Sequence, residues 1–426
     1  MIIKVVTLGC KVNQCESASI VAALLKNGYN ASEGMSPSDV YVLNTCSVTA
    51  EADRKSRQYL SKMRKLNAEC KIIVIGCSSQ NCTEKFAAEN VVAIGGTQNK
   101  ADFILKTVNS LQQNNKYSNL SDIILYENLY NSAQSADKYC YEEYPKFDRT
   151  RSFVKIQDGC NRFCTYCIIP YLRGRSRSRT IDDILNECAK MTSKEIVLTG
   201  IDMSAYGKDI GVGFADLLKA LSVCKARKRL GSLECEVIDD DLLTAMSDGG
   251  YCPHFHLSLQ SGSNGVLRTM NRKYDTEYYY DKLSLIRRYF PFAGITTDII
   301  VGFPTETDEN FEESLDFAKK CEFSDIHVFP YSSRKGTLAA QKYKMLDKSI
   351  VEERVKKMLE VKQSSREAFL LKNFGKSYEV YSEIEHGDFC VGYTPNYIKV
   401  YSAVPCGTID SVTLAEPYLD GVIGNK

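Results

Sequence analysis

The chain contains no tryptophan, only four histidines and only ten prolines among its 426 residues. It also lacks an excess of either charge, because 54 Lys and Arg residues face 53 Asp and Glu residues and leave a net charge of +1. Attraction by the molecule as a whole therefore cannot hold a nucleic acid, and any such contact needs a local basic surface. No apolar run approaches the roughly 18 residues of a membrane helix, so we expect no membrane partner.

Cysteine, by contrast, is abundant, with 17 residues. The first ten residues show no secretory leader pattern, and the odd cysteine count and wide spacing do not match a small disulfide scaffold. We therefore expect a cytoplasmic protein in a reducing environment, with some of its thiols bound to metal. Several other cysteines should be ordinary buried thiols.

The first hundred residues alternate apolar segments with polar, helix-like segments. Strands are predicted at 2–8, 39–44, 71–75 and 91–94, and helices at 16–26 and 51–66. Regular alternation of this kind indicates an α/β domain with a parallel, doubly wound sheet. We assign this domain to residues 1–113.

Three further regions follow along the chain. Residues 114–145 are polar and rich in Asn, Gln and Ser, so we interpret them as a linker that includes a short strand at 123–126. Residues 146–372 again alternate strands with helices, which indicates a partial or full β/α barrel that ends in a long charged helix. Residues 373–426 change to short alternating strands, which indicate a small all-β barrel.

Three cysteines directly follow the first predicted strand of the β/α barrel: Cys160, Cys164 and Cys167. A four-iron cluster ordinarily takes four thiolates, so three protein ligands leave one iron open, as catalytic metal sites do. An open iron can bind the amino and carboxylate groups of S-adenosylmethionine (SAM) and pass it an electron. The alternative is a zinc knuckle with a distant fourth ligand, but no histidine lies near this loop.

A second set of cysteines lies in the N-terminal domain. Cys10, Cys46 and Cys77 each stand just after a predicted parallel strand. The carboxyl ends of such strands meet at one crevice of the sheet, so the three thiols are expected to converge on a second cluster. Gly9 and Gly76 give the backbone room to turn there. Taken singly, each of these cysteines would more simply be a core thiol.

These motifs resemble the methylthiotransferase family of radical SAM enzymes. The resemblance rests on TLGCKVNQ at 7–14, on Asn44-Thr-Cys46, on Gly76-Cys77 and on the segment 160–179, in which Tyr166 supplies the aromatic residue of the radical SAM motif. It implies an N-terminal cluster domain, a radical SAM barrel and a C-terminal TRAM domain. It also implies two 4Fe-4S clusters, of which one generates the 5′-deoxyadenosyl radical from SAM and the other supplies sulfur.

The segment around Cys10 resembles the branch that adds a methylthio group at C2 of N6-threonylcarbamoyladenosine, at position 37 beside the anticodon of tRNA. The implied partners are tRNA, rather than DNA, and an electron donor such as flavodoxin or ferredoxin. One position departs from the family pattern, because Ser78 stands where an aromatic residue is common.

The resemblance also suggests which residues bind cofactor and RNA. Candidates for SAM binding lie at the ends of predicted strands: Tyr166, Thr199, Gly200, Ser258, Gln260, Asp298, Gly302 and Pro304. Candidates for RNA binding are Arg173 and Arg175 after the cluster loop and Tyr393, Tyr397 and Lys399 in the C-terminal domain. For the individual side chains, plain βα turns and a solvated charged edge remain the alternatives.

Other functions remain open from the sequence alone. A methylthiotransferase of the same family could act on another modified adenosine of tRNA or on a ribosomal protein. A protein of a different class would be a non-catalytic iron–sulfur sensor that binds RNA, or a structural zinc protein. The SAM-loop resemblances favour the enzyme.

Overall fold

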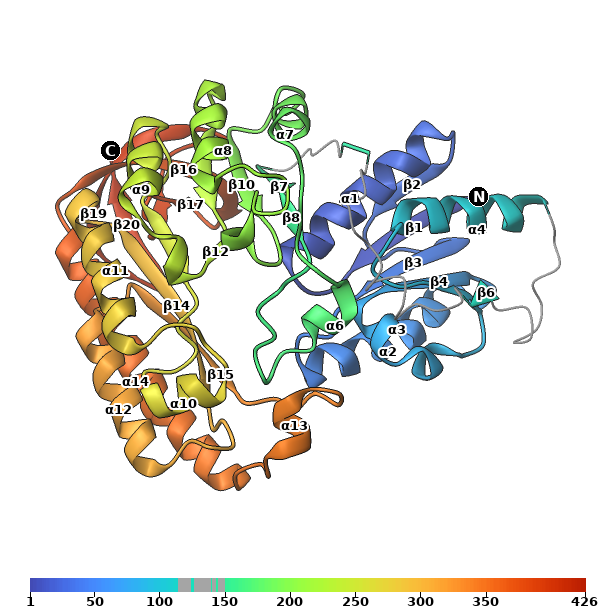
Figure 1. The fold of residues 1–426 in the computed structure, drawn as a ribbon. Helices are drawn as coiled ribbons and strands as arrows, with labels where there is room; N and C mark the ends of the chain where they lie inside the picture. The colour runs from blue at the N-terminus through green and yellow to red at the C-terminus, as the bar shows by residue number, and fades with distance from the viewer. Residues whose placement is uncertain (114–123, 126–138, 140–142, 145–149) are drawn as a thin grey trace.

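The computed structural model describes residues 1–113, 124–125, 139, 143–144 and 150–426. Figure 1 shows an N-terminal α/β domain beside a larger β/α core, with a small β-barrel against the core. None of the described helices is long and apolar enough to cross a membrane.

The N-terminal domain is a parallel six-stranded sheet, as the sequence predicts. Its order is β2-β1-β3-β4-β5-β6, and its strands are β1 (Ile2–Thr7), β2 (Asn30–Glu33), β3 (Val40–Thr45), β4 (Lys71–Gly76), β5 (Val91–Ile94) and β6 (Ile124–Leu125). One face packs on α1 (Lys11–Lys26) and α4 (Lys100–Gln113), and the other on α2 (Ala50–Leu66) and the short α3 (Cys77–Asn81). Because β6 pairs with β5, the sheet reaches beyond residue 113 into the segment that we interpreted as linker.

Local sequence explains how α2 begins and ends. Thr49 caps its N-terminus by accepting a hydrogen bond from the backbone N–H of Ala52, at 3.1 Å. Acidic residues occupy its first turn and basic residues its last turn, which suits the helix dipole.

The core is a partial β/α barrel of parallel strands. One sheet has the order β11-β10-β7 and the other β12-β13-β14-β15. Only Gly231 separates β11 from β12, so the two sheets form one curved wall. The strands are β7 (Arg151–Lys155), β10 (Glu195–Thr199), β11 (Arg227–Leu230), β12 (Ser232–Leu233), β13 (His254–Leu257), β14 (Gly294–Val301) and β15 (Asp325–Pro330).

Helices cover the outside of this wall and bury a single large apolar core against it. They are α7 (Ile181–Cys188), α8 (Phe214–Ala220), α9 (Asp240–Asp248), α10 (Asn264–Thr269), α11 (Thr276–Tyr289) and α12 (Asp308–Cys321), followed by α13 (Leu338–Lys342) and the long α14 (Lys348–Asn373). The cluster loop lies between the short strands β8 (Gln157–Asp158) and β9 (Arg177–Ser178) and contains α6 (Ile169–Arg173).

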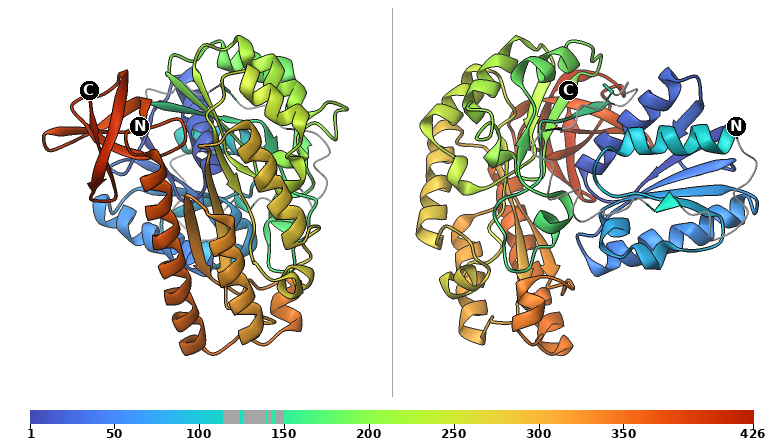
Figure 2. Two further views of the ribbon diagram at one scale, coloured as in Figure 1. Left: turned by 90° about the vertical axis from the view of Figure 1, so that its left-hand side faces the viewer. Right: turned by 45° about the vertical axis from the view of Figure 1, so that its right-hand side comes forward.

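The C-terminal domain is a closed barrel with the strand order β16-β17-β18-β20-β19, in line with the expected TRAM-like domain. Its strands are β16 (Ser377–His386), β17 (Phe389–Tyr393), β18 (Lys399–Ser402), β19 (Ile409–Tyr418) and β20 (Gly421–Asn425). Figure 2 shows α14 leading directly into this barrel. A disulfide that the sequence analysis did not predict joins Cys390 to Cys406.

The small barrel docks on the amino ends of the core strands. Arg227 and Arg229, at the start of and within β11, donate hydrogen bonds to backbone carbonyls of the C-terminal domain. Asn396 donates to the carbonyl of Phe292, just before β14. The carboxyl ends of the core strands, where cofactors bind in β/α barrels, therefore stay clear of this domain.

Candidate active site

The loop with Cys160, Cys164 and Cys167 is held in a compact wrap by its own backbone. The N–H of Cys160 donates to the carbonyl of Gly174 at 3.1 Å, and the N–H of Cys167 donates to the carbonyl of Cys164 at 3.0 Å. Gly159 precedes the first cysteine with a φ of +73°, and a Cβ there would lie 1.9 Å from the carbonyl oxygen of Arg175. Only glycine fits where the two arms of the loop cross.

Two thiols of this loop, those of Cys160 and Cys167, hold their protons more tightly than free cysteine does. Burial raises the pKa of Cys167 to about 12, and burial together with the Asp202 carboxylate also raises the pKa of Cys160. Arg272 donates a hydrogen bond to the sulfur of Cys164 at 3.3 Å. A bound metal would displace the thiol protons, so this donor set fits a metal centre whose binding releases protons.

The spacing of the sulfurs favours a cluster over one zinc ion. Within the described residues, neither cysteine triad brings its three sulfurs within 4.8 Å of one another. A single tetrahedral zinc with bonds of about 2.3 Å would require that closeness. Each thiolate of a four-iron cluster binds a different iron, and a wider spacing suits it.

The second triad stands at the ends of three neighbouring parallel strands. Cys10 follows β1 and begins α1, Cys46 follows β3, and Cys77 follows β4. Gly9 has a φ of +99°, and a Cβ there would lie 2.6 Å from the sulfur of Cys46. Burial and the neighbouring Cys77 raise the pKa of Cys46 to about 11. The topology therefore brings together thiols that are far apart in sequence, as the strand-end pattern predicts.

The two triads face each other across the domain boundary. Cys77 packs against Ile168 and Leu172, which directly follow the radical SAM cysteines. Thr97 of the N-terminal domain donates to the carbonyl of Leu172 at 2.7 Å, and Gln98 donates to the carbonyl of Arg173 at 3.2 Å. Two metal centres held by these cysteines would thus share one reaction space.

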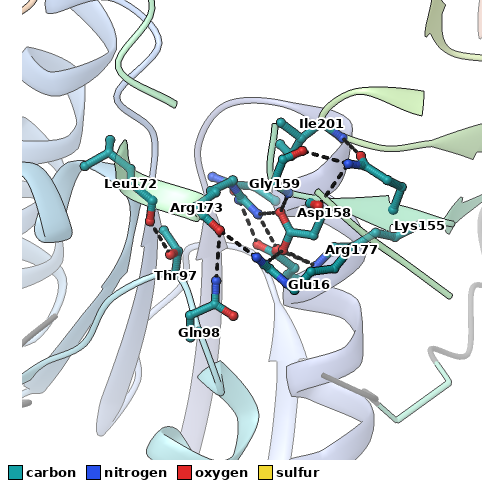
Figure 3. A network of polar contacts seen from close by, with 12 residues as sticks. Glu16, Thr97, Gln98, Lys155, Asp158, Gly159, Leu172, Arg173, Arg177 and Ile201 are labelled. Atoms are coloured by element: carbon teal, nitrogen blue, oxygen red, sulfur yellow. Dashed lines mark hydrogen bonds and ion pairs between the residues drawn. The ribbon is translucent and has the colours of Figure 1, made fainter. Parts of the chain in front are cut away.

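A buried ionic network locks this arrangement (Figure 3). The guanidinium of Arg173 donates to Glu16 on α1 at 2.8 Å, to Asp158 at 3.0 Å and to Asn13 at 2.8 Å. Lys155 bonds both carboxylates, at 2.8 Å to Glu16 and 3.1 Å to Asp158. Lys100 pairs with Glu16, and Arg177 with Asp158. Buried charges persist only when they are paired in this way.

The network also acts on the second triad. Burial raises the pKa of Cys77, while Arg173 opposes that rise by its charge and by a hydrogen bond. Burial by itself would raise the pKa of Glu16, but Arg173, Lys100 and Lys155 outweigh it and hold that pKa well below its usual value. Arg173 therefore keeps a fixed positive charge beside the thiol of Cys77.

The structure corrects one of the expected RNA contacts. Arg173 has no exposed surface, so its expected contact with RNA is wrong: the ion pairs at the domain boundary use the side chain fully. Tyr397 stacks on Tyr393, with ring centroids 4.8 Å apart, and on His254, at 4.5 Å, and it stays 37% exposed. Tyr393 is also covered by Arg151, 4.8 Å from its centroid.

Two other RNA candidates remain at the surface. Arg175 is exposed and lies over the ring of Phe163, at 4.6 Å. Lys399 is partly exposed and pairs with Asp420 at 2.7 Å. Both keep surface that a phosphate can reach.

Several SAM candidates occupy backbone positions that the strand ends require. Gly200 sits against Gln157, whose side-chain oxygen accepts from the N–H groups of Ile201 and Asp202 at 3.0 and 2.8 Å. Gln260 has a φ of +71° and donates its N–H to the carbonyl of Asp298. The N–H of Gly302, also at positive φ, donates to the Glu306 carboxylate at 2.8 Å.

The other SAM candidates differ in their surroundings. Thr199 is buried at the end of β10, and Tyr166 packs into a small apolar cluster with Phe303. The carbonyl of Ser258 accepts from the hydroxyl of Tyr274 at 2.5 Å. Pro304 follows Phe303 in the turn after β14.

The interior of the barrel contains a cavity of about 540 Å³. Asp298 lines it, three residues before the end of β14, together with His256 on β13 and His327 on β15. The Nε2 of His256 lies 3.2 Å from a carboxylate oxygen of Asp298. Lys11 reaches this cavity from the N-terminal domain, and Tyr397 reaches it from the C-terminal domain. All three domains therefore contribute to the lining of one cavity.

Sequence reasoning missed most of the charged residues around the clusters. Glu16, Lys100 and Asp158 carry no motif that reveals their pairing: Glu16 and Lys100 are 84 residues apart, and Arg173, which joins Glu16 to Asp158, belongs to the cluster loop. Arg162 likewise pairs with Asp202 at 2.9 Å and with Glu236 at 2.8 Å across the mouth of the barrel. One pairing was readable: Arg179 with Asp183 and Glu187, which are spaced four residues apart along α7.

Comparison with known proteins agrees with this geometry. Residues 154–318 match the radical SAM superfamily, and residues 3–95 match the uncharacterized protein family UPF0004. A solved structure of similar fold is the radical S-adenosylmethionine methyltransferase TsrM from Kitasatospora setae. It has a TM-score of 0.56 at 12% sequence identity and covers 80% of this chain and 77% of that chain.

Curated relatives span nearly the whole length. The threonylcarbamoyladenosine tRNA methylthiotransferase MtaB of Bacillus subtilis (strain 168) is 37% identical over 417 residues, which cover 92% of this chain and 88% of the relative. The tRNA-2-methylthio-N(6)-dimethylallyladenosine synthase of Acetivibrio thermocellus is 34% identical over 390 residues, which cover 88% and 79%. This chain belongs to the radical SAM tRNA methylthiotransferase family.

Proposed function

We propose that the chain adds a methylthio group at C2 of N6-threonylcarbamoyladenosine at position 37 of tRNA. The observation that carries this proposal is the pair of facing cysteine triads, since sulfur insertion needs a radical generator and a sulfur source in one reaction space. The relatives named for the threonylcarbamoyl substrate, at 32–37% identity, support the choice of nucleoside.

The residues divide the work between two centres. Cys160, Cys164 and Cys167 would hold the 4Fe-4S cluster that reduces SAM, and Cys10, Cys46 and Cys77 would hold the second cluster. When bound, these groups supply a 5′-deoxyadenosyl radical and sulfur. The protein's own contribution is to orient them, because Arg173 and its carboxylate partners fix the N-terminal domain against the cluster loop.

The strand-end candidates would surround SAM, with the backbone turns at Gly200, Gln260 and Gly302 giving the cofactor close access. Arg175 and Lys399 would contact tRNA phosphates at the surface. The electron donor would be a flavodoxin or ferredoxin, and the location would be the cytoplasm.

The test is mass spectrometry of nucleosides after incubation of the reconstituted protein with SAM and dithionite. The substrates are anticodon stem–loops carrying threonylcarbamoyladenosine, dimethylallyladenosine or unmodified adenosine at position 37. We expect a 2-methylthio product from the threonylcarbamoyl substrate. Product from the dimethylallyl substrate alone would contradict the proposal.

Two cysteine variants complete this test. Cys10→Ala is expected to cleave SAM to 5′-deoxyadenosine but to form no methylthio product, because only the second cluster loses a ligand. Cys160→Ala is expected to lose both products. If Cys10→Ala still forms the methylthio product normally, the proposed second cluster is wrong.

A further inference from the structure

The cavity inside the barrel contains a cation without a partner. Lys11 lines this cavity, and its ammonium makes no hydrogen bond or ion pair with the residues that the structure describes. Most other charged groups of the lining are paired: Lys399 with Asp420, Asp325 with Lys362 and Asp298 with His256. An unpaired ammonium that lines a cavity can bind an anion.

The surroundings of Lys11 reinforce this positive charge. Arg151, Arg227 and Arg229 all pair with the single carboxylate of Glu195, and Arg151 pairs in addition with Glu383. These three guanidinium groups pair with only two carboxylates, so positive charge is in excess here even without Lys11. The positive potential at this end of the cavity is therefore uncompensated.

Arg229 contributes charge here rather than a free donor. Its guanidinium bonds Glu195 and the carbonyls of Thr394 and Pro395. The start of α1 adds to the same field, because its first turn holds no acidic residue and Cys10 makes no side-chain cap.

A second group points to the same ligand. His254 lines the cavity, is only 8% exposed, and its Nδ1 has no hydrogen-bond partner among the described residues. Its ring is fixed by stacking on Tyr397. Burial, together with Arg229 and other nearby cations, lowers the pKa of His254 well below its usual value, so the ring is neutral at pH 7. The unpartnered ring nitrogen of His254 is thus a second polar group without a partner close to the ammonium of Lys11.

We propose that Lys11, with His254 beside it, binds the carboxylate of the threonyl group on the substrate nucleoside. Lys11 directly follows Cys10, so an anion held by its ammonium lies next to the sulfur-supplying centre. An uncharged prenyl group offers this cation no partner, which selects against the dimethylallyl substrate. This inference rests on the proposed function and adds the residue that recognises the substrate's carboxylate.

The anion could come from two parts of a tRNA: the threonyl carboxylate or a backbone phosphate. The cavity favours the carboxylate, because a nucleoside side chain enters a cavity more readily than a backbone does. A substrate whose carboxyl is a methyl ester separates the two sources, since esterification removes the carboxylate and keeps every phosphate.

The experiment measures binding, by fluorescence anisotropy, of anticodon stem–loops that carry the free acid or the methyl ester. Wild-type protein and three variants, all with matched iron and sulfide content, are compared: Lys11→Gln, Lys11→Arg and Lys208→Gln. Lys208 is exposed outside the cavity and serves as the matched control.

We expect the wild-type protein and Lys208→Gln to bind the acid roughly ten- to a hundredfold more tightly than the ester. Lys11→Gln is expected to lose most of that preference, and Lys11→Arg to keep much of it. An unchanged preference in Lys11→Gln would overturn the proposal. Equal weakening of acid and ester would also overturn it and assign Lys11 to a phosphate.

The proposed function fails in a different way. If the proposed function is wrong, the wild-type protein makes no methylthio product from the threonylcarbamoyl stem–loop. This result does not depend on how tightly the protein binds the methyl ester. If the protein modifies that stem–loop but binds acid and ester equally well, only the proposed carboxylate subsite is wrong.

Discussion

Two neighbouring arginines show how differently one residue type is used in this protein. Arg173 is fully buried and pairs with Glu16 and Asp158, whereas Arg175 is exposed and lies over Phe163. Their spacing in the sequence gives no hint of this difference. A buried ion pair contributes mainly through the cost of leaving one partner unpaired.

Arg173→Gln is therefore expected to lower the free energy of unfolding by about 3–5 kcal/mol, because two buried carboxylates lose a partner. Arg175→Gln, the matched control, should stay within about 0.5 kcal/mol of the wild type. Urea denaturation followed by tyrosine fluorescence measures both, since the chain has no tryptophan. Equal effects of the two substitutions would show that the network is not stabilising.

At the scale of the element, the turn after β1 brings the backbone of Gly9 against Cys46, a ligand of the proposed second cluster. Gly9 and Gly28 both adopt positive φ, at +99° and +82°, but only Gly9 is crowded, since a Cβ there would meet Cys46. At Gly28 nothing lies within 4 Å. A substitution at Gly28 therefore tests backbone strain alone, whereas a substitution at Gly9 tests the same strain together with a steric conflict with Cys46.

Gly9→Ala is expected to lose about half of the iron after reconstitution, because the displaced Cys46 no longer closes the second site. Gly28→Ala carries a similar strain of roughly 1–2 kcal/mol but should load iron fully. Iron and sulfide analysis checks the pair. Full loading of the Gly9 variant would mean that the turn tolerates a side chain.

The same scale shows what the sequence can and cannot predict. The parallel sheet, the strand-end cysteines and the C-terminal barrel follow from periodicity, topology and motif spacing, which are local or nearly local signals. The pairing of β6 with β5 and the stacking of Tyr397 on His254 do not, because both are contacts between distant segments. Arg173 was misread for the same reason: its partner Glu16 belongs to another domain.

At the scale of the whole molecule, the joint between the N-terminal domain and the barrel depends on pH. Arg173, Lys100 and Lys155 hold the pKa of Glu16 well below 4.5, despite its burial. A depressed folded-state pKa means that this stabilisation is complete above pH about 4.5. It disappears as the pH falls through the folded-state value.

The wild-type protein should accordingly lose stability below pH 4.5 more steeply than Glu16→Gln, which has no carboxylate to protonate there. Glu51→Gln, which alters an exposed pair with Arg54, should follow the wild type. Urea midpoints measured between pH 7 and pH 3 test this. If the urea midpoints of the wild type and Glu16→Gln fall in parallel as the pH is lowered, groups other than Glu16 cause the acid sensitivity.

The contact between Arg151 and Glu383 has a consequence for the order of events during synthesis. Arg151 begins the first strand of the barrel, yet its partner Glu383 belongs to the small C-terminal barrel, which leaves the ribosome later. At the usual rate of translation, tens of seconds separate the two. For that time the nascent barrel carries Arg151, Arg227 and Arg229 on an uncovered end, in a cell rich in RNA. Folding of the small C-terminal barrel thus ends the period in which these arginines are open to non-specific contact with RNA.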